Sequence, residues 1–345
     1  MRRYGWTISA VMAGCLLAGC SALPALPGMG GAKADPAATG KPSASSAPKP
    51  ARAVSDQEAT SVLADYVKRN NAANKARSDE LLAGYEGGSS FAIDKASYAS
   101  SRILRKTIKY QPFGYTGAAF RAPAAGQQPW FLATAHWQRK PTTSKEPTYL
   151  LFARQGDGWR QMYSPDAFDG TTTDELPAIA ADASGVATAV GPTDGTGLLM
   201  SPADFAKKYA AHMVGKGTAA DKSLFAADSI TTGAAKTRQR MTQYARISSA
   251  ARPVTRYPSY TLRTTDGGAL TFTTIERTIR YDVRQGPERN YVFQKDSGIL
   301  RGKYYTYMKI TDLFQVAAHI PPKSGKPDQV KVLANYSGLV AGSGR

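Results

Sequence analysis

Cysteine and histidine, which most often serve as nucleophiles, acid–base groups and metal ligands, are scarce in this chain of 345 residues. It has two cysteines, Cys15 and Cys20, and three histidines, His136, His212 and His319. No histidine has another three or four residues away, the spacing of metal sites on helices. Phosphate-cradling and nucleophile-elbow glycine motifs are also missing from any usable context. The sequence therefore predicts no metal, no cofactor and no identifiable reaction.

The two cysteines lie in the segment MAGCLLAGC, which ends a mostly apolar run that follows Arg2 and Arg3. The run, Tyr4–Leu17, is shorter than the ~20 residues of a membrane-spanning helix. It has the length of the apolar part of a signal peptide. Leu17-Ala18-Gly19-Cys20 resembles a bacterial lipobox. The resemblance implies a signal peptide over residues 1–19, cleavage before Cys20 and a diacylglyceryl group on the Cys20 thiol.

Two alternatives to this interpretation remain. Cys15 also follows Ala-Gly, although it would leave a shorter apolar run, and the signal could be an ordinary secretory one with an incidental cysteine. With cleavage before Cys20 the mature chain keeps one cysteine and can form no internal disulfide. We expect a lipid-anchored protein on the outer face of a bacterial cell membrane, because two acyl chains hold a protein stably.

The residues after Cys20 predict a tether. Ser21–Ala53 consists mainly of proline, alanine, glycine and serine. Such a segment buries too little apolar surface to fold, and as a flexible coil it would span roughly 30 Å. The lipidated cysteine and tether are thus assigned to residues 20–53.

The remaining residues suggest two domains joined by a connector over 170–200. In the first domain, 54–169, Ser55 and Glu58 form a capping-box pattern before a helical apolar face. Gly87 and Gly88 predict a chain break before the next long helix. The expected helices after the first are 78–83 and 94–104, and the expected strands are 105–110, 113–120, 130–139, 148–155 and 159–163.

The second domain, 201–345, repeats this order. A helix begins after Ser201, with Pro202 in its first turn. Two further helices are expected at 222–227 and 233–248, followed by strands at 259–265, 269–284, 304–317 and 329–339. A small hairpin is expected within the connector, around residues 182–185. The repeat concerns the order of elements only.

Helices packed on one face of a curved antiparallel sheet make an α+β fold. The order of elements in each half resembles the NTF2-like (cystatin-like) cone, so we expect two such cones in tandem. The mature chain also resembles an uncharacterised family of actinobacterial lipoproteins. NNAANKARSDELLAGYEGG (70–88) and LPAIAADASGVATAV (176–190) carry that resemblance together with the lipobox. It supports surface location and domain layout, and implies no activity.

Because NTF2-like cones can hold a polar pocket, the resemblance implies candidate site residues in the first cone. These are Asp65, Tyr66, Tyr85 and His136. An apolar pocket could raise a carboxylate pKa for proton abstraction. Asp65 is equally well explained as a solvent-facing helix residue, and Tyr66 as part of the apolar stripe.

Charge is the most informative remaining feature. Of the formal net charge of +18, residues 54–175 contribute +2 (15 basic, 13 acidic) and residues 201–345 contribute +13 (23 basic, 10 acidic). A domain this basic attracts polyanions. For an exported protein these are anionic lipids or wall polymers, and no nucleic acid partner is expected. The sequence predicts a non-catalytic binding or scaffolding role at the anionic envelope; the alternative is a small-molecule or enzymatic pocket inside one cone. It identifies no protein partner.

Overall fold

The computed structural model describes residues 51–105, 110–126, 128–286, 290–294, 297–324, 326 and 328–345. The chain divides into two parts, Met1–Pro48 and Lys49–Arg345. The predicted signal peptide, Cys20 and nearly all of the tether lie outside the described residues. Everything below concerns the second part, which is a single compact unit. No helix among its described residues has the length and apolar character needed to cross a membrane.

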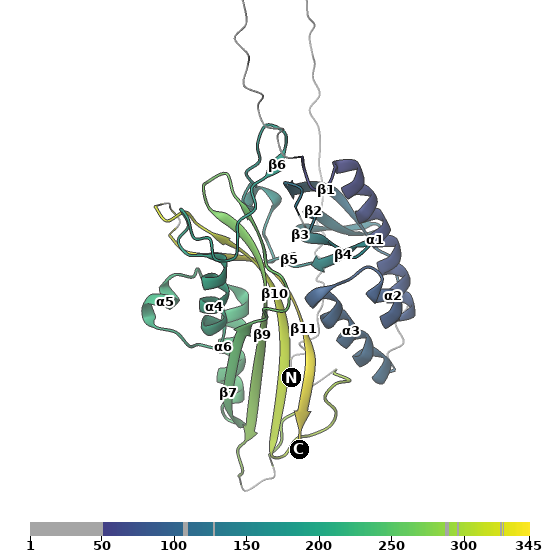
Figure 1. Ribbon diagram of the computed structural model, residues 1–345. Coiled ribbons are helices and arrows are strands. Elements are labelled where there is room, and N and C mark those ends of the chain that lie inside the picture. Colours follow the sequence, from purple (N-terminus) through teal and green to yellow (C-terminus); the bar gives the residue numbers. More distant parts are fainter. Residues whose placement is uncertain are drawn as a thin grey trace, which may run out of the picture. The chain divides into compact units, whose positions relative to one another are not determined.

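The elements follow one another in two sets, shown in Figure 1. The first set is α1 (Asp56–Ala76), α2 (Asp79–Ala83), α3 (Gly88–Ile103), β1 (Gly114–Pro123), β2 (Trp130–Arg139), β3 (Thr142–Gln155), β4 (Gly158–Tyr163) and β5 (Asp166–Ala167). A linking stretch holds a 3-10 turn (Thr173–Glu175) and β6 (Val186–Ala187). The second set is α4 (Pro202–Met213), α5 (Ala219–Ser223), α6 (Ser229–Met241), β7 (Ala245–Pro253), β8 (Tyr260–Arg263), β9 (Ala269–Val283), β10 (Tyr307–Ile320) and β11 (Lys331–Gly344).

One sheet runs through both sets. Its strand order is β6-β1-β2-β3-β5-β11-β10-β9-β7, with β4 paired to β3 and β8 paired to β9. All pairings between these strands are antiparallel except that of β6 with β1. The short strand β5 joins the two sets, because it pairs with β3 on one side and β11 on the other. The predicted α+β class is confirmed as a large, mainly antiparallel sheet with few helices.

The two sets share one further detail. In each set, a residue that follows the second helix forms an isolated parallel bridge. Glu86 pairs with Gln161 of β4 in the first set, and Phe225 pairs with Val330, just before β11, in the second. In both sets the third helix follows this bridge, and the antiparallel strands follow the helix. The repetition of element order therefore extends to a matching chain path.

Helix α1 begins as the sequence predicts, with one difference. The Ser55 side chain accepts a hydrogen bond from the Glu58 amide at 3.1 Å. The Glu58 carboxylate does not complete a capping box; it accepts a hydrogen bond from the indole of Trp159 at 3.1 Å. A side chain expected to serve only its own helix thus links α1 to β4.

The predicted break before the third helix is present, with Gly87 as the extended N-cap residue, but the predicted helix start is wrong, because α3 already begins at Gly88. These glycines permit close packing. A Cβ on Gly87 would lie 2.8 Å from Met162 Sδ, and Gly88 has φ of +55°. The expected helix start at residue 94 was therefore one and a half turns too late.

The third helix of the second set was also mispredicted. The expected helix 233–248 is α6, which ends at Met241, and its last residues belong to strand β7. No glycine or proline lies between Met241 and Ala245, so the sequence holds no stop signal there. Helix α5 lies earlier than expected, and four residues of the strand expected at 105–110 lie outside the described residues.

Helix α3 contacts the second set of strands through polar side chains. Thr274, Gln315 and Tyr336 are register partners across β9, β10 and β11. We call these three residues the polar row. The row meets α3 through hydrogen bonds from Thr274 to Ser89 (2.8 Å), from Gln315 to Ser89 and Ser90 (2.9 and 2.8 Å), and from Tyr336 to Asp94.

Candidate functional site

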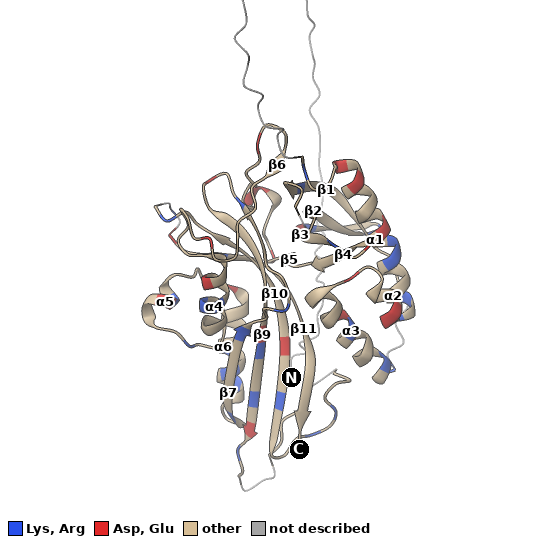
Figure 2. Cartoon of the chain, in the orientation of Figure 1, with Lys and Arg blue, Asp and Glu red and all other residues tan. Residues whose placement is uncertain are grey.

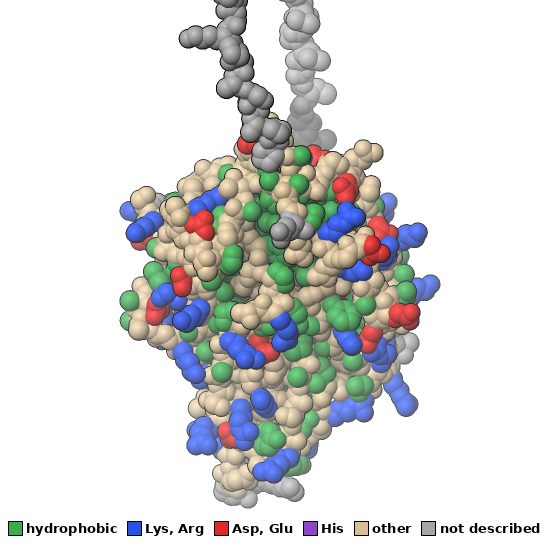
Figure 3. All heavy atoms as spheres, viewed as in Figure 1, with side chains coloured by type: hydrophobic (Ala, Val, Ile, Leu, Met, Phe, Trp, Pro, Cys, Tyr) green, Lys and Arg blue, Asp and Glu red, His purple; other side chains and the backbone are tan. Residues whose placement is uncertain are grey.

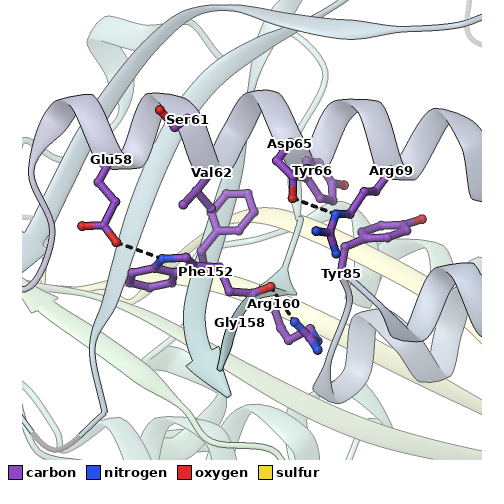
Figure 4. Close-up of a pocket in the computed structure, with 11 residues that line it drawn as sticks. Glu58, Ser61, Val62, Asp65, Tyr66, Arg69, Tyr85, Phe152, Gly158 and Arg160 are labelled. Carbon is purple, nitrogen blue, oxygen red and sulfur yellow. Dashed lines mark hydrogen bonds and ion pairs between the residues drawn. The ribbon is translucent and has the colours of Figure 1, made fainter. Parts of the chain in front are cut away.

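A pocket of about 330 Å³ lies between helix α1 and strands β3 and β4. It brings together Asp65, Tyr66 and Tyr85, three of the four predicted site residues (Figure 4). The aromatic rings of Phe152 and Trp159 contribute to its apolar surface. The other lining residues are Glu58, Ser61, Val62, Arg69, Gly158 and Arg160.

The charged groups at the rim of this pocket already have partners. Asp65 forms an ion pair with Arg69 at 2.7 Å, and both side chains are about half exposed. Arg69 also donates a hydrogen bond to the Gly84 carbonyl at 3.1 Å. Figure 4 shows the Asp65–Arg69 pair as a dashed line, with Tyr66 and Tyr85 beside it. The arrangement suits binding of a small ligand against aromatic surfaces more than proton abstraction by Asp65.

The fourth predicted residue, His136, is not in this pocket. Its Nδ1 lies 3.2 Å from the Ser144 carbonyl oxygen, and its Nε2 lies 3.1 Å from Thr173 Oγ1. One ring nitrogen thus contacts the neighbouring strand β3 and the other contacts the linking stretch, so His136 lies outside the pocket beside α1.

Tyr66 and Tyr85 form the boundary between the pocket and a polar interior. Their rings meet edge to face at 5.6 Å. Tyr66 accepts a hydrogen bond from the Asn70 amide at 2.8 Å, whereas the buried Tyr85 hydroxyl has no partner among the described residues. Burial raises the pKa of both phenols, so they stay neutral.

Two carboxyl groups in this interior were not among the site residues predicted from the sequence. Glu86 is 4% exposed and interacts electrostatically with Asp94. Burial, then the charge of Asp94, raises the pKa of Glu86 well above its usual range. Burial also raises the pKa of Asp94 to about 6, although hydrogen bonds from Tyr336 and Glu86 act in the opposite direction. Burial therefore favours the protonated form of both carboxyl groups.

The second set encloses a mainly apolar interior at the corresponding place. Phe225 makes the bridge that Glu86 makes in the first set, and it packs against Phe205, Tyr209 and His212. The cluster around it also includes Ile230, Phe314 and Val330. The two halves thus share a chain path and differ in the polarity of what they bury.

A basic surface occupies the end of the sheet where β9 runs into β10. We define the basic end as residues 240–249, 279–286, 290–294, 297–311 and 340–345. It contains one acidic residue, Asp282, which is paired with Arg280 at 2.8 Å. Its eight basic residues are all exposed: Arg240, Arg246, Arg280, Arg284, Arg301, Lys303, Lys309 and Arg345. Figure 2 shows basic positions on the lower parts of β7, β9 and β10, and Figure 3 shows the same end in space-filling form.

Exposed aromatic side chains accompany these charges. Tyr244, Tyr291 and Phe293 are 44%, 38% and 53% exposed, and they account for three of the five large exposed apolar side chains of the described residues. The Tyr291 ring lies 6.1 Å from Phe293 and beneath the Lys303 ammonium at 4.3 Å.

The comparisons with known proteins give one matching family model and several similar lipoproteins. The family model described as a domain of unknown function, DUF8094, matches residues 50–344. Two proteins named "Uncharacterized lipoprotein" in Streptomyces coelicolor are 31% and 26% identical to the chain, over 52% and 83% of it and 51% and 85% of their own lengths. A Streptomyces avermitilis protein of that name is 26% identical over 85% of this chain and 86% of its own.

The alignment with the first of these relatives spans about half of that protein's length. No solved structure matches the chain. The family match covers nearly all of the compact unit, from residue 50 to the last strand. The chain therefore belongs to the DUF8094 family.

Proposed function

We propose that this protein is an extracytoplasmic lipoprotein anchored to the outer face of the membrane through Cys20. The lipobox-like segment supports the proposal, as do the names of three relatives. The tether 20–53 would connect the lipid to the compact unit.

We further propose that the unit consists of two NTF2-like cones, 54–169 and 201–345, joined by the connector 170–200. The support is the repeated order of helices and strands, and above all the matching parallel bridges of Glu86 and Phe225. In this proposal β5 fuses the two cone sheets edge to edge.

The role that we propose for the folded unit is non-catalytic docking on an anionic surface of the envelope. The carrying observation is the basic end, where eight exposed cations face a single acid. Clustered charge of one sign raises the local concentration of polyanions and speeds their encounter. Each basic side chain near an anionic lipid surface contributes about 1 kcal/mol.

The pocket of the first half supports a second candidate function, binding of a small molecule. Its aromatic wall and partnered rim charges resemble the lining of ligand pockets, which are mainly apolar with few polar groups. Trp159 lies in that wall, so its fluorescence would report an occupant.

Charge reversal at the basic end should abolish most of the docking. We expect Lys303→Glu with Lys309→Glu to weaken binding of the Lys49–Arg345 unit to anionic vesicles or wall polymer by roughly 30-fold or more, since two attractive charges become repulsive. The matched control is Lys323→Glu with Lys331→Glu, which makes the same change of net charge outside the basic end. Co-sedimentation at low and high salt provides the measurement. Equal loss in both double variants, or binding that ignores salt, would contradict the proposal.

The lipid anchor has its own prediction. In the full-length protein, Cys20→Ala should release the chain from membranes washed with high salt, and Cys15→Ala should leave it attached. The reason is that only a diacylated cysteine holds a protein without electrostatic help. Ultracentrifugation of cell fractions, with labelled fatty acid incorporation, measures both. Continued attachment of the Cys20→Ala protein after the wash would show that the anchor lies elsewhere.

A further inference from the structure

The basic end combines two kinds of side chain that serve different partners when they occur alone. Cations by themselves fit any polyanion. Tyrosine and phenylalanine exposed beside cations are typical of protein surfaces at the boundary between lipid headgroups and acyl chains. The question is therefore how the structure presents these aromatic rings.

The rings are held outward by the residue between them. Val292 is 2% exposed and packs with Leu300 and Met308 in an apolar cluster. It also exchanges backbone hydrogen bonds with Tyr304, at 2.8 and 2.9 Å. Because successive side chains of an extended segment point to opposite sides, burial of Val292 directs Tyr291 and Phe293 to the surface.

Two neighbours widen this surface. The Tyr244 carbonyl accepts a hydrogen bond from the Arg284 amide at 2.8 Å, which places the exposed Tyr244 at the end of β9. The Ile103 carbonyl accepts a hydrogen bond from the Arg301 guanidinium, so the exposed end of α3 adjoins the same loop. Four of the five large exposed apolar side chains of the described residues thus lie at or beside the basic end.

The basic side chains lie beside the aromatic rings, where the lipid headgroups would be if the rings entered a bilayer. Lys303 covers the Tyr291 ring, and Arg280 and Arg345 lie over the Tyr307 ring at 4.2 and 5.7 Å. A ring that enters the acyl boundary would leave these charges at the level of the lipid phosphates, as long basic side chains do at membrane interfaces.

We infer that the basic end is a membrane-docking surface, which inserts Tyr291 and Phe293 into the interface of an anionic phospholipid bilayer while the surrounding cations bind its phosphates. This inference rests on the proposed function and narrows it, because an anionic wall polymer would need the charges and no insertion. Charge complementarity and the outward rings select the bilayer as the occupant.

The test separates insertion from attraction. In the Lys49–Arg345 unit, Phe293→Trp places an indole at the basic end, while the native tryptophans Trp130, Trp137 and Trp159 all lie in the first half. With vesicles of phosphatidylglycerol and phosphatidylcholine in equal parts, we expect the new emission to shift to the blue and to be quenched by brominated acyl chains. Leu81→Trp, at a 46% exposed site on α2, is the matched control and should show neither change.

A second variant measures the contribution of insertion to binding. Tyr291→Ser with Phe293→Ser should lower vesicle affinity about tenfold or more and leave the salt dependence in place, because the cations remain. Leu81→Ser should leave affinity unchanged, and thermal melts should show that each variant is folded.

The outcomes are distinct. Salt-sensitive vesicle binding without quenching, and without loss in the serine variant, overturns the inference and leaves the proposed function standing. Binding to wall polymer but not to vesicles does the same. Absence of binding to either overturns both.

Discussion

Replacing Gln315 with leucine should destabilise the compact unit by about 3–5 kcal/mol. Gln315 is completely buried, and its amide nitrogen lies within 3.0 Å of Ser89 Oγ, Ser90 Oγ and the Met162 carbonyl. Its carbonyl oxygen accepts a hydrogen bond from the Ser164 amide at 2.8 Å. Leucine would remove all four hydrogen bonds, each worth about 0.5–1.5 kcal/mol, and would leave the Ser164 amide without its partner.

Urea denaturation of the Lys49–Arg345 unit measures this effect. Gln138→Leu is the control, because Gln138 is partly exposed and its one side-chain bond among the described residues, to Thr143, lies at the surface. We expect that variant to stay within about 0.5 kcal/mol of the parent. A Gln315→Leu protein whose free energy of unfolding stays within about 1 kcal/mol of the parent would show that the polar row contributes little.

The second large effect concerns pH. Glu86→Gln should stabilise the unit at pH 8 and change its stability little below pH 5. The reason is that burial raises the pKa of Glu86 in the folded protein. The contribution of this carboxyl to the stability is fully present below its unfolded pKa, near 4.5, and is lost as the pH rises through its folded pKa. A difference of one between the folded and unfolded pKa corresponds to about 1.4 kcal/mol of stability, and an amide has no charge to bury. Asp94→Asn should act in the same direction, over the window from 3.8 to about 6.

Chemical denaturation from pH 5 to pH 8 tests this prediction. Comparison with the parent removes the general effect of net charge, which all variants share closely. Asp65→Asn is the control, since Asp65 is half exposed in a surface ion pair of small value. The prediction fails if the parent, Glu86→Gln and Asp94→Asn proteins lose stability with pH at the same rate.

The sequence predicted the elements best where a local pattern is strong. Strand β2 has the predicted bounds, and Ser55 and Ser201 cap their helices as expected. The errors occur where tertiary packing overrides local signals. Helix α3 begins at Gly88 and not at residue 94 as expected, and the close contacts of Gly87 and Gly88 with β4 are tertiary features that no local pattern indicates.

The candidate site was only partly accessible to sequence reasoning. Asp65, Tyr66 and Tyr85 do meet in one pocket, since the helical spacing and the turn after α2 are local features. The Glu86–Asp94 pair and the polar row could not be predicted from local sequence, because they depend on contacts with β11 and β10. Ser89, Ser90 and Asp94 look like solvent-facing helix residues until those strands cover them. The one available signal was Glu86 itself. It is an acidic residue next to the buried Tyr85, whereas the corresponding residue of the second half is Phe225.

Helix α3 also determines the order in which the protein can be completed. Its bonds to Gln315 and Tyr336 join residues that are 225 and 242 positions apart, whereas β1 to β4 pair mainly with near neighbours. Contacts so distant form late, since loop closure must precede them. During synthesis from the amino terminus, the polar side of α3 therefore stays exposed to water until the last strand has been made. A chain truncated before β11 would lack the hydrogen bond from Tyr336 to Asp94 and the pairing of β11 with β5, and would leave that part of α3 exposed to water.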